Sequence, residues 1–125
     1  SYQLTALTSR DLELFLTRRY IDGATKARLE KLIDLRSQIN QIEAKLKSLD
    51  DEEEKISDDQ KRLRENIETL SKTPEAKALI TRYVEKVNSQ ETRLEAMTKE
   101  RQTLEAEQDK IADELAKEIR NFDLK

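Results

Sequence analysis

The sequence Ser71-Lys72-Thr73-Pro74 separates two long stretches whose apolar residues recur with a heptad period. Pro74 suits the first position of a helix, because the backbone N–H that it lacks would have no partner there. Thr73 before it can act as the N-cap by accepting a hydrogen bond from a free backbone N–H. These residues therefore predict a tight turn between two helices that fold back on each other.

Two heptad runs flank this turn, over residues 24–70 and 74–120. Position a recurs from Leu32 in the first run and from Ile80 in the second, and position d follows three residues after each. This 3–4 spacing never slips, which is typical of a coiled coil. Each helix would be about 70 Å long at the standard rise. The pattern predicts an all-α fold, a long antiparallel two-helix coiled-coil hairpin with its turn at 71–74.

The segment before the hairpin divides into two parts. Residues 1–7 alternate weakly, and we interpret them as a linker or a remnant of a preceding domain. Residues 8–21 carry apolar side chains at helical spacing, which predicts a short helix. Gly23 can end that helix, or the Asp before it caps the next one, so the hairpin takes residues 22–125. We expect the short helix to dock at the base of the hairpin through Phe15 and its apolar neighbours.

So short a turn also predicts the register of the two helices. The a and d residues, which together form the seam, should face each other where their numbers sum to about 143. In that register the g positions meet as pairs of opposite charge: Lys31/Glu114, Lys45/Glu100, Glu52/Arg93 and Asp59/Lys86. Exposed pairs add little stability, so they select the register while burial of the seam drives folding. The e positions Asp50 and Glu91 meet as like charges, which the register does not explain.

The same register places polar residues inside the seam. The expected neighbours are Glu53 and Gln90, Gln60 and Tyr83, Arg101 and Ile42, and Gln108 and Leu35. Such residues can form a buried network or a partner site. They can equally reach water from a half-exposed seam, as long polar side chains commonly do. Gln60 and Tyr83 could form a hydrogen bond, because a partly buried phenol usually finds a partner.

The composition fits solvated helices and excludes several classes of protein. Charged residues make up 41% of the chain, with one Gly and one Pro, so the turn residues of an all-β fold are missing. Disorder is the competing interpretation of so much charge, but a disordered chain needs no heptad period. The net charge of −3 gives no attraction to nucleic acid or anionic lipid. No apolar run is long enough to span a membrane, and no signal peptide is visible.

No pattern of side chains indicates catalysis, a metal or a cofactor. The acidic run 50–54, continued by Asp58 and Asp59, supplies carboxylates, but these radiate around a helix and lack the glycine of a calcium loop. The chain has no His and no Cys, which removes the usual zinc ligands and thiol chemistry. A straight hairpin offers no concave pocket. We therefore predict a protein that is not an enzyme, with no cofactor and no small-molecule substrate.

A nucleic-acid-binding arm is the alternative function, because the helical hairpin of seryl-tRNA synthetases binds RNA. Arg62, Arg64 and Lys72 lie near the turn, but Glu65 and Glu68 interleave with them. Binding to phosphates normally requires a basic stripe, and exposed aromatic residues for stacking are absent. The sequence therefore does not favour nucleic acid as a partner.

Residues near the turn also carry a family resemblance. They are Gln60, Arg62-Leu63-Arg64-Glu65-Asn66-Ile67, Leu70, Arg82-Tyr83-Val84 and Gln90-Glu91. From about Leu12 onwards the chain resembles the C-terminal helical region of the uncharacterised bacterial mucoidy-inhibitor-like proteins. The resemblance implies a larger exported protein, periplasmic or beyond, in which a β-rich domain precedes the hairpin. It carries over no catalytic or binding residue.

The candidate functional residues lie at the end that carries the turn. Leu79 and Val84 fall outside the seam, near Arg64 and Asn66, and we name these the tip residues. A mixed apolar and polar patch of this kind is typical of a contact surface, although scattered surface residues are the ordinary alternative. We predict a structural and interaction module, a rigid stalk of a larger protein whose tip engages a protein partner or a second copy.

Overall fold

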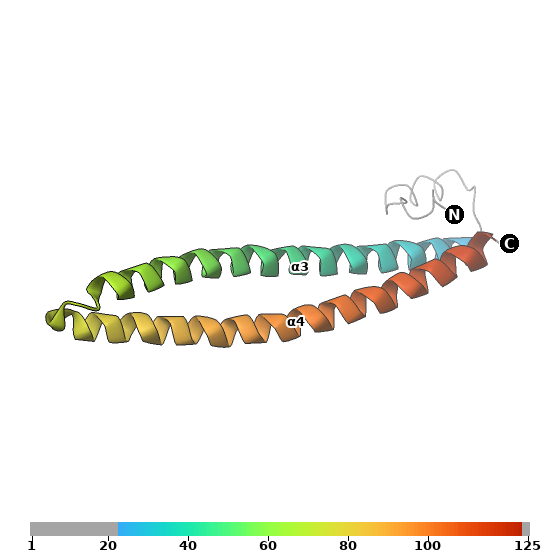
Figure 1. Cartoon of the computed structure of the whole chain (residues 1–125). Coiled ribbons are helices and arrows are strands. Elements are labelled where there is room, and N and C mark those ends of the chain that lie inside the picture. Colours follow the sequence, from blue (N-terminus) through green and yellow to red (C-terminus); the bar gives the residue numbers. More distant parts are fainter. Residues whose placement is uncertain (1–22, 124–125) are drawn as a thin grey trace. The chain divides into compact units, whose positions relative to one another are not determined.

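The computed structural model describes residues 23–123, and they form two long helices joined by a turn (Figure 1). Helix α3 spans Gly23–Leu70, the short 3-10 helix η1 spans Pro74–Ala76, and helix α4 spans Lys77–Asp123. The two long helices run in opposite directions, so the predicted helical hairpin is confirmed. The predicted segments 1–7 and 8–21, with the expected docking of the short helix, lie outside the described residues.

The turn is held by backbone hydrogen bonds. The N–H of Thr73 donates to the carbonyl of Leu70 at 2.9 Å, and the N–H of Ala76 donates to the carbonyl of Thr73 at 3.0 Å. The hydroxyl of Ser71 donates to the Glu68 carbonyl at 2.7 Å. These bonds satisfy groups that the end of α3 and the start of η1 leave without helical partners.

The expected side-chain cap at Thr73 is wrong, although Pro74 does take the first helical position. Thr73 is the N-cap residue by position, but its hydroxyl makes no capping hydrogen bond. The physical reason is the 3-10 geometry of the first turn. The Ala76 N–H that a capping hydroxyl would accept is already donated to the carbonyl of Thr73.

The start of α3 differs slightly from the sequence prediction. Gly23 is its first helical residue rather than a residue that ends a preceding helix. A Cβ at Gly23 would meet nothing within 4 Å, and its φ does not lie in the left-handed region. Its lack of a side chain is therefore not required for packing here.

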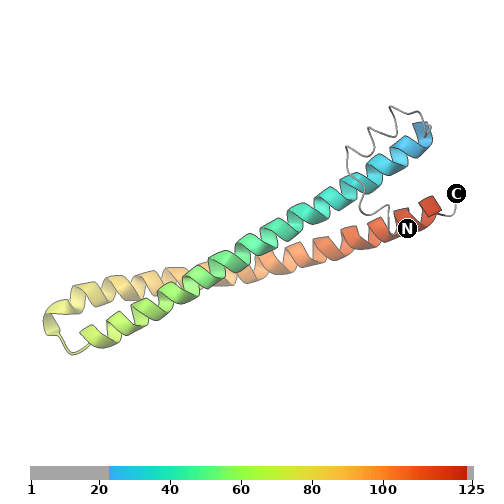
Figure 2. The ribbon, with the colours of Figure 1, turned by 90° about the horizontal axis from the view of Figure 1, so that it is seen from above.

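The hairpin consists of two compact units. The turn unit comprises residues 45–103, and the terminal unit comprises the described residues up to Ala44 and from Leu104 onwards. In each unit a segment of α3 packs against a segment of α4. Figures 1 and 2 both show the two helices side by side where they flank the turn.

The terminal unit contains the more completely buried part of the seam. Its buried aliphatic residues are Leu29, Leu32, Leu35, Ile39, Ile42, Leu104, Ile111 and Leu115. Across this seam the Nζ of Lys31 lies 3.1 Å from the Oε1 of Glu114, as the register predicts.

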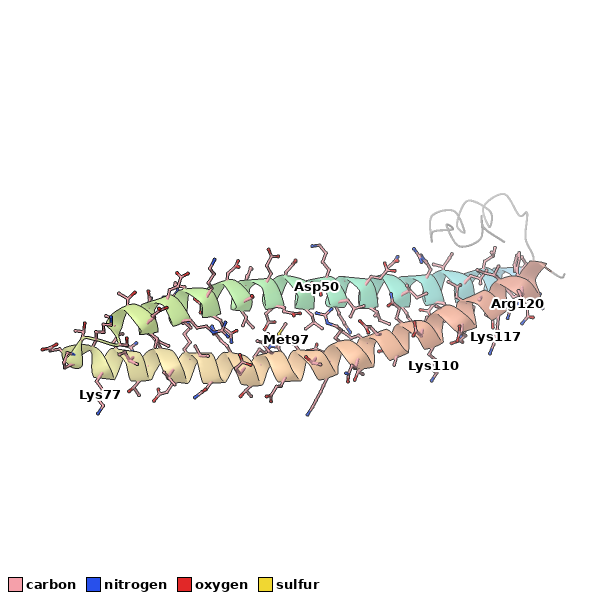
Figure 3. All side chains as sticks on the ribbon, viewed as in Figure 1. Asp50, Lys77, Met97, Lys110, Lys117 and Arg120 are labelled. Atoms are coloured by element: carbon pink, nitrogen blue, oxygen red, sulfur yellow. The ribbon has the colours of Figure 1, made fainter. Side chains whose placement is uncertain are left out.

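The turn unit buries fewer of its seam residues. Leu49, Leu63 and Met97 are buried, and Figure 3 shows Met97 between the two helices. Ile56 and Val87, although also seam residues, are only half-buried. Two helices without a third cover their seam from one side only, so some aliphatic surface stays in contact with water.

Ion pairs form at three of the four g-position pairs that the sequence predicts, one in the terminal unit and two in the turn unit. Besides Lys31 and Glu114, Arg93 lies 2.6 Å from Glu52, and Lys86 lies 3.2 Å from Asp59. The fourth expected pair, Lys45 with Glu100, does not form within the described part of the chain. Glu100 lies instead 3.8 Å from Arg93, two turns away on the same helix. Arg93 thus competes with Lys45 for the carboxylate of Glu100.

Candidate functional site

Arg101 is a seam residue of α4 that reaches two carboxylates of α3. Its Nη1 lies 2.6 Å from Asp50 and its Nη2 lies 3.0 Å from Glu53. Both contacts hold the pKa of Arg101 above its ordinary value, the hydrogen bond to Asp50 being the larger cause. The like-charge pair expected of Asp50 and Glu91 does not form among the described residues, because Asp50 contacts Arg101 and Glu91 contacts Gln60 instead.

Gln60 is the one polar side chain among the buried residues of the described chain, at 5% exposure. Its Nε2 donates to the Oε1 of Glu91 at 2.9 Å. Gln60 therefore pairs with Glu91 and not with Tyr83. A carboxylate is the stronger acceptor, because a hydrogen bond to a charged group is stronger than one between neutral groups.

Gln90 completes the polar part of the seam. Its Nε2 donates to the Oδ2 of Asp59 at 2.6 Å, while its own Oε1 is buried without a hydrogen-bond partner among the described residues. Asp59 also lies 2.9 Å from Arg62 and 3.2 Å from Lys86. These hydrogen bonds lower the pKa of Asp59, and the one from Arg62 is the largest cause.

Ion pairs at the g positions also shift the pKa values of the residues that form them. Arg93 donates two hydrogen bonds to Glu52, at 2.6 and 2.9 Å. This bidentate contact lowers the pKa of Glu52 and raises that of Arg93. A hydrogen bond to Glu114 likewise raises the pKa of Lys31.

The polar seam residues thus serve the pairing of the two helices. Arg101, Gln60 and Gln90 each reach a carboxylate at the edge of the seam, and each contact joins α3 to α4. The neighbours expected from the sequence, Glu53 with Gln90 and Gln60 with Tyr83, are not the pairs that form. Gln60 contacts Glu91, eight residues beyond Tyr83, and Gln90 contacts Asp59, six residues beyond Glu53. In the predicted register Gln60 and Glu91 would lie about 12 Å apart along the axes, in addition to the separation of the helices. Their hydrogen bond could not form at that distance, so the predicted register is wrong in the turn unit.

The tip residues remain exposed to different degrees. Leu79 and Val84 are the large apolar residues with exposed side chains in the described chain, at 38% and 42%. Arg64 is exposed, whereas Asn66 is half-buried rather than largely exposed as expected. Each of these side chains lies in the turn unit.

The tip residues do not share one flank of the hairpin. Leu79 and Val84 lie five residues apart on α4, which places them about 140° apart around the helix axis. By heptad position, Val84 and Arg64 belong to the flank of the e positions. Leu79 and Asn66 belong to the flank of the g positions. The predicted patch is therefore divided into two pairs.

The acidic run provides ion pairs rather than a binding site. Asp50, Glu52 and Glu53 contact arginines of α4, and Asp51 lies 3.4 Å from Lys47. Over residues 23–123, no cluster of carboxylates is placed to hold a metal ion. The helices described there are also too polar to cross a membrane.

Comparisons with known proteins identify no relative. A scan against protein-family models gives no match, and searches of curated proteins and of solved structures give none.

Proposed function

We propose that this chain is a non-enzymatic structural and interaction module, in which the two helices form an antiparallel coiled coil that acts as a stalk. The contacts of Arg101, Gln60 and Gln90 carry this proposal. Polar side chains in a catalytic or ligand site converge on a common point, whereas these point to separate carboxylates along the seam. Their role is to hold one helix in register on the other.

The proposal also covers the larger protein that would contain this chain. The run Arg62-Leu63-Arg64-Glu65-Asn66-Ile67 and the other residues that resemble the mucoidy-inhibitor-like proteins support a larger, exported bacterial protein. In that protein the hairpin would project from a preceding domain and present its turn to a partner.

The contact surface is proposed at the tip residues. Leu79 and Val84 stand out because they are large apolar residues that are exposed near the turn, at 38% and 42%. Burying them against another protein would remove their apolar surface from water, which favours association. Arg64 and Asn66 would add polar contacts beside them.

The test replaces both apolar tip residues with charge. Leu79→Glu together with Val84→Glu should leave helicity and the melting temperature nearly unchanged, because both sites are exposed. The variant should lose the partners that the full-length protein captures, or its self-association in sedimentation. A control with Ala78→Glu and Ala96→Glu adds the same charge at other exposed sites of α4. Unchanged partners and unchanged sedimentation of the tip variant would show that the tip is not the contact surface.

A further inference from the structure

Hydrogen bonds across the seam define the register of the two helices in the turn unit. Gln60 of α3 donates to Glu91 of α4 at 2.9 Å, and Gln90 of α4 donates to Asp59 of α3 at 2.6 Å. The residue numbers of these pairs sum to about 150, whereas those of the predicted register sum to about 143. The observed register therefore lies one heptad, about 10 Å along the helices, from the predicted one.

Two ion pairs of the turn unit are compatible with both registers. They are Glu52 with Arg93 and Asp59 with Lys86. Their residue numbers sum to about 145, between the values of the two registers. The long side chains of Arg93 and Lys86 span the remaining offset in the structure. The predicted register would therefore keep these two contacts while it breaks the hydrogen bonds of the seam.

The predicted register would also relieve a charge imbalance. In the structure Arg93 lies 2.6 Å from Glu52 and 3.8 Å from Glu100, so two carboxylates share one guanidinium. Lys45 is exposed and forms no ion pair with any residue that the structure describes. The predicted register sets Lys45 opposite Glu100. Each then has an oppositely charged neighbour, and Arg93 no longer serves two carboxylates.

The turn contains residues that can adapt to the predicted register. Pro74–Ala76 form the 3-10 helix η1, and the hydroxyl of Thr73 makes no capping hydrogen bond. If η1 became α-helical, the N–H of Ala76 would leave the carbonyl of Thr73, and the Thr73 hydroxyl could accept it. Helix α4 would then begin at Pro74 instead of Lys77. The connection between the helices would shorten, as the predicted register requires.

Like charges at the e positions oppose the predicted register. In that register the carboxylates of Asp50 and Glu91 would face each other. In the structure Asp50 instead lies 2.6 Å from the Nη1 of Arg101. Glu91 accepts its hydrogen bond from Gln60. Asp50 and Glu91 therefore favour the observed register in two ways, through the contacts that they make in it and through their repulsion in the other.

We infer that the turn unit has two registers, one heptad apart, between which α4 can move along α3. The observed register is held by the polar contacts across the seam and by the separation of Asp50 from Glu91. The second register is the one predicted from the heptads. It is held by Lys45 with Glu100 and by an α-helical first turn of α4.

The packing of the turn unit permits this movement. Both registers place seam positions opposite seam positions, because they differ by a whole heptad. Ile56 and Val87 are only half-buried in the observed register. Gln90 buries its Oε1 without a hydrogen-bond partner among the described residues. Partly buried aliphatic side chains and an unsatisfied acceptor both reduce the stability of this register relative to its alternative.

This inference goes beyond the proposed function and does not depend on the tip residues. A partner that binds the turn unit more tightly in one register would select that register. Binding to the second register would displace α4 along α3 by about 10 Å. Contact at the turn would thereby move one helix of the turn unit past the other.

A single charge reversal should exchange the two registers. Asp50→Lys places a second cation beside Arg101 in the observed register and gives Glu91 an oppositely charged neighbour in the second one. Asp58→Lys is the matched control, because Asp58 is exposed at an outward f position and forms no ion pair among the described residues. The wild type and the control should occupy the observed register, and Asp50→Lys should occupy the second.

Distances between pairs of spin labels measure the register, since the chain has no cysteine of its own. One pair of labelled cysteines replaces Lys55 and Arg82, and the other replaces Lys55 and Thr103, all of which are exposed. On passing to the second register, the separation along the helices should fall from about 20 to about 10 Å for the first pair. It should rise from about 12 to about 22 Å for the second pair. Dilution with unlabelled protein removes distances between copies.

Opposite changes in the two distances identify a change of register. A hairpin that merely opened would lengthen both distances, and that result would overturn the proposal. Distances in Asp50→Lys equal to those of the wild type, with helicity retained in circular dichroism, would overturn it as well.

A second variant decides if Asp50→Lys loses its helicity. Gln60→Ala removes the hydrogen bond to Glu91 without reversing a charge. It should populate the second register beside the observed one, which gives two distances for each pair of labels. One distance for each pair, unchanged from the wild type, would then overturn the proposal.

Discussion

At the scale of the residue, stability and register depend on different side chains. Leu63 is fully buried in the seam of the turn unit, where its removal from water stabilises the folded state. Arg101 and Gln60 lie in the same seam but make directional contacts to Asp50 and Glu91. An aliphatic residue tolerates many alignments of two helices, whereas a pair of hydrogen-bonded polar groups tolerates one.

Leu63→Ala tests the contribution of the buried seam. The substitution should lower the free energy of unfolding by about 2–5 kcal/mol, because it removes buried methyl groups and leaves a cavity. Leu79→Ala is the matched control, since the same side chain is 38% exposed there, and it should cost much less. Urea unfolding followed by circular dichroism gives both values. Equal effects at the two positions would contradict the assigned packing.

At the scale of the element, the turn and the heptads were predictable and the contacts of long side chains were not. Proline at the first helical position and the unbroken a and d spacing located both helices. The capping hydroxyl of Thr73 was not predictable, because the sequence does not show that the helix opens with a 3-10 turn. Gln60 and Arg101 were placed in the seam correctly, but their partners were not predictable, because the register in the turn unit differs from the predicted one.

The division of the tip residues between two flanks was also available from heptad positions. Val84 is at position e and Leu79 at position g, and these positions lie on opposite sides of the seam. Proximity along the sequence suggested a single patch, while helical geometry separates it. The lower exposure of Asn66 required the structure, because it depends on how closely α4 packs beside it.

The ion pairs between the helices make part of the stability dependent on pH. The pKa of Asp59 is lowered in the folded chain by Arg62, Gln90 and Lys86. A carboxyl whose pKa falls on folding stabilises the folded state above its unfolded pKa, about 3.9 for Asp. That contribution is lost as the pH falls through the lower, folded value.

Asp59→Asn should therefore destabilise the hairpin at pH 7 and have progressively less effect below about pH 4. The measurement is the difference in urea midpoint between wild type and variant across this range. Asp58→Asn is the control, because Asp58 is exposed and forms no ion pair among the described residues. If Asp59→Asn lowered the urea midpoint equally at pH 7 and at pH 2.5, the assigned ion pairs would be contradicted.

At the scale of the whole molecule, the proposed function depends on α3 and α4 pairing within one chain. The proposed stalk needs a turn at 71–74 that places both pairs of tip residues near the turn. Lys31 with Glu114 joins α3 to α4 in the terminal unit, and Glu52 with Arg93 does so in the turn unit.

The distance between spin labels at Lys45→Cys and Glu100→Cys tests this pairing most directly. Both residues are exposed g positions of the turn unit, and they form no ion pair with each other. In labelled protein diluted with unlabelled protein, the hairpin predicts a distance below about 20 Å, since packed helices lie 8–10 Å apart. A distance of about 80 Å, as one continuous helix through the turn would give, would contradict the account.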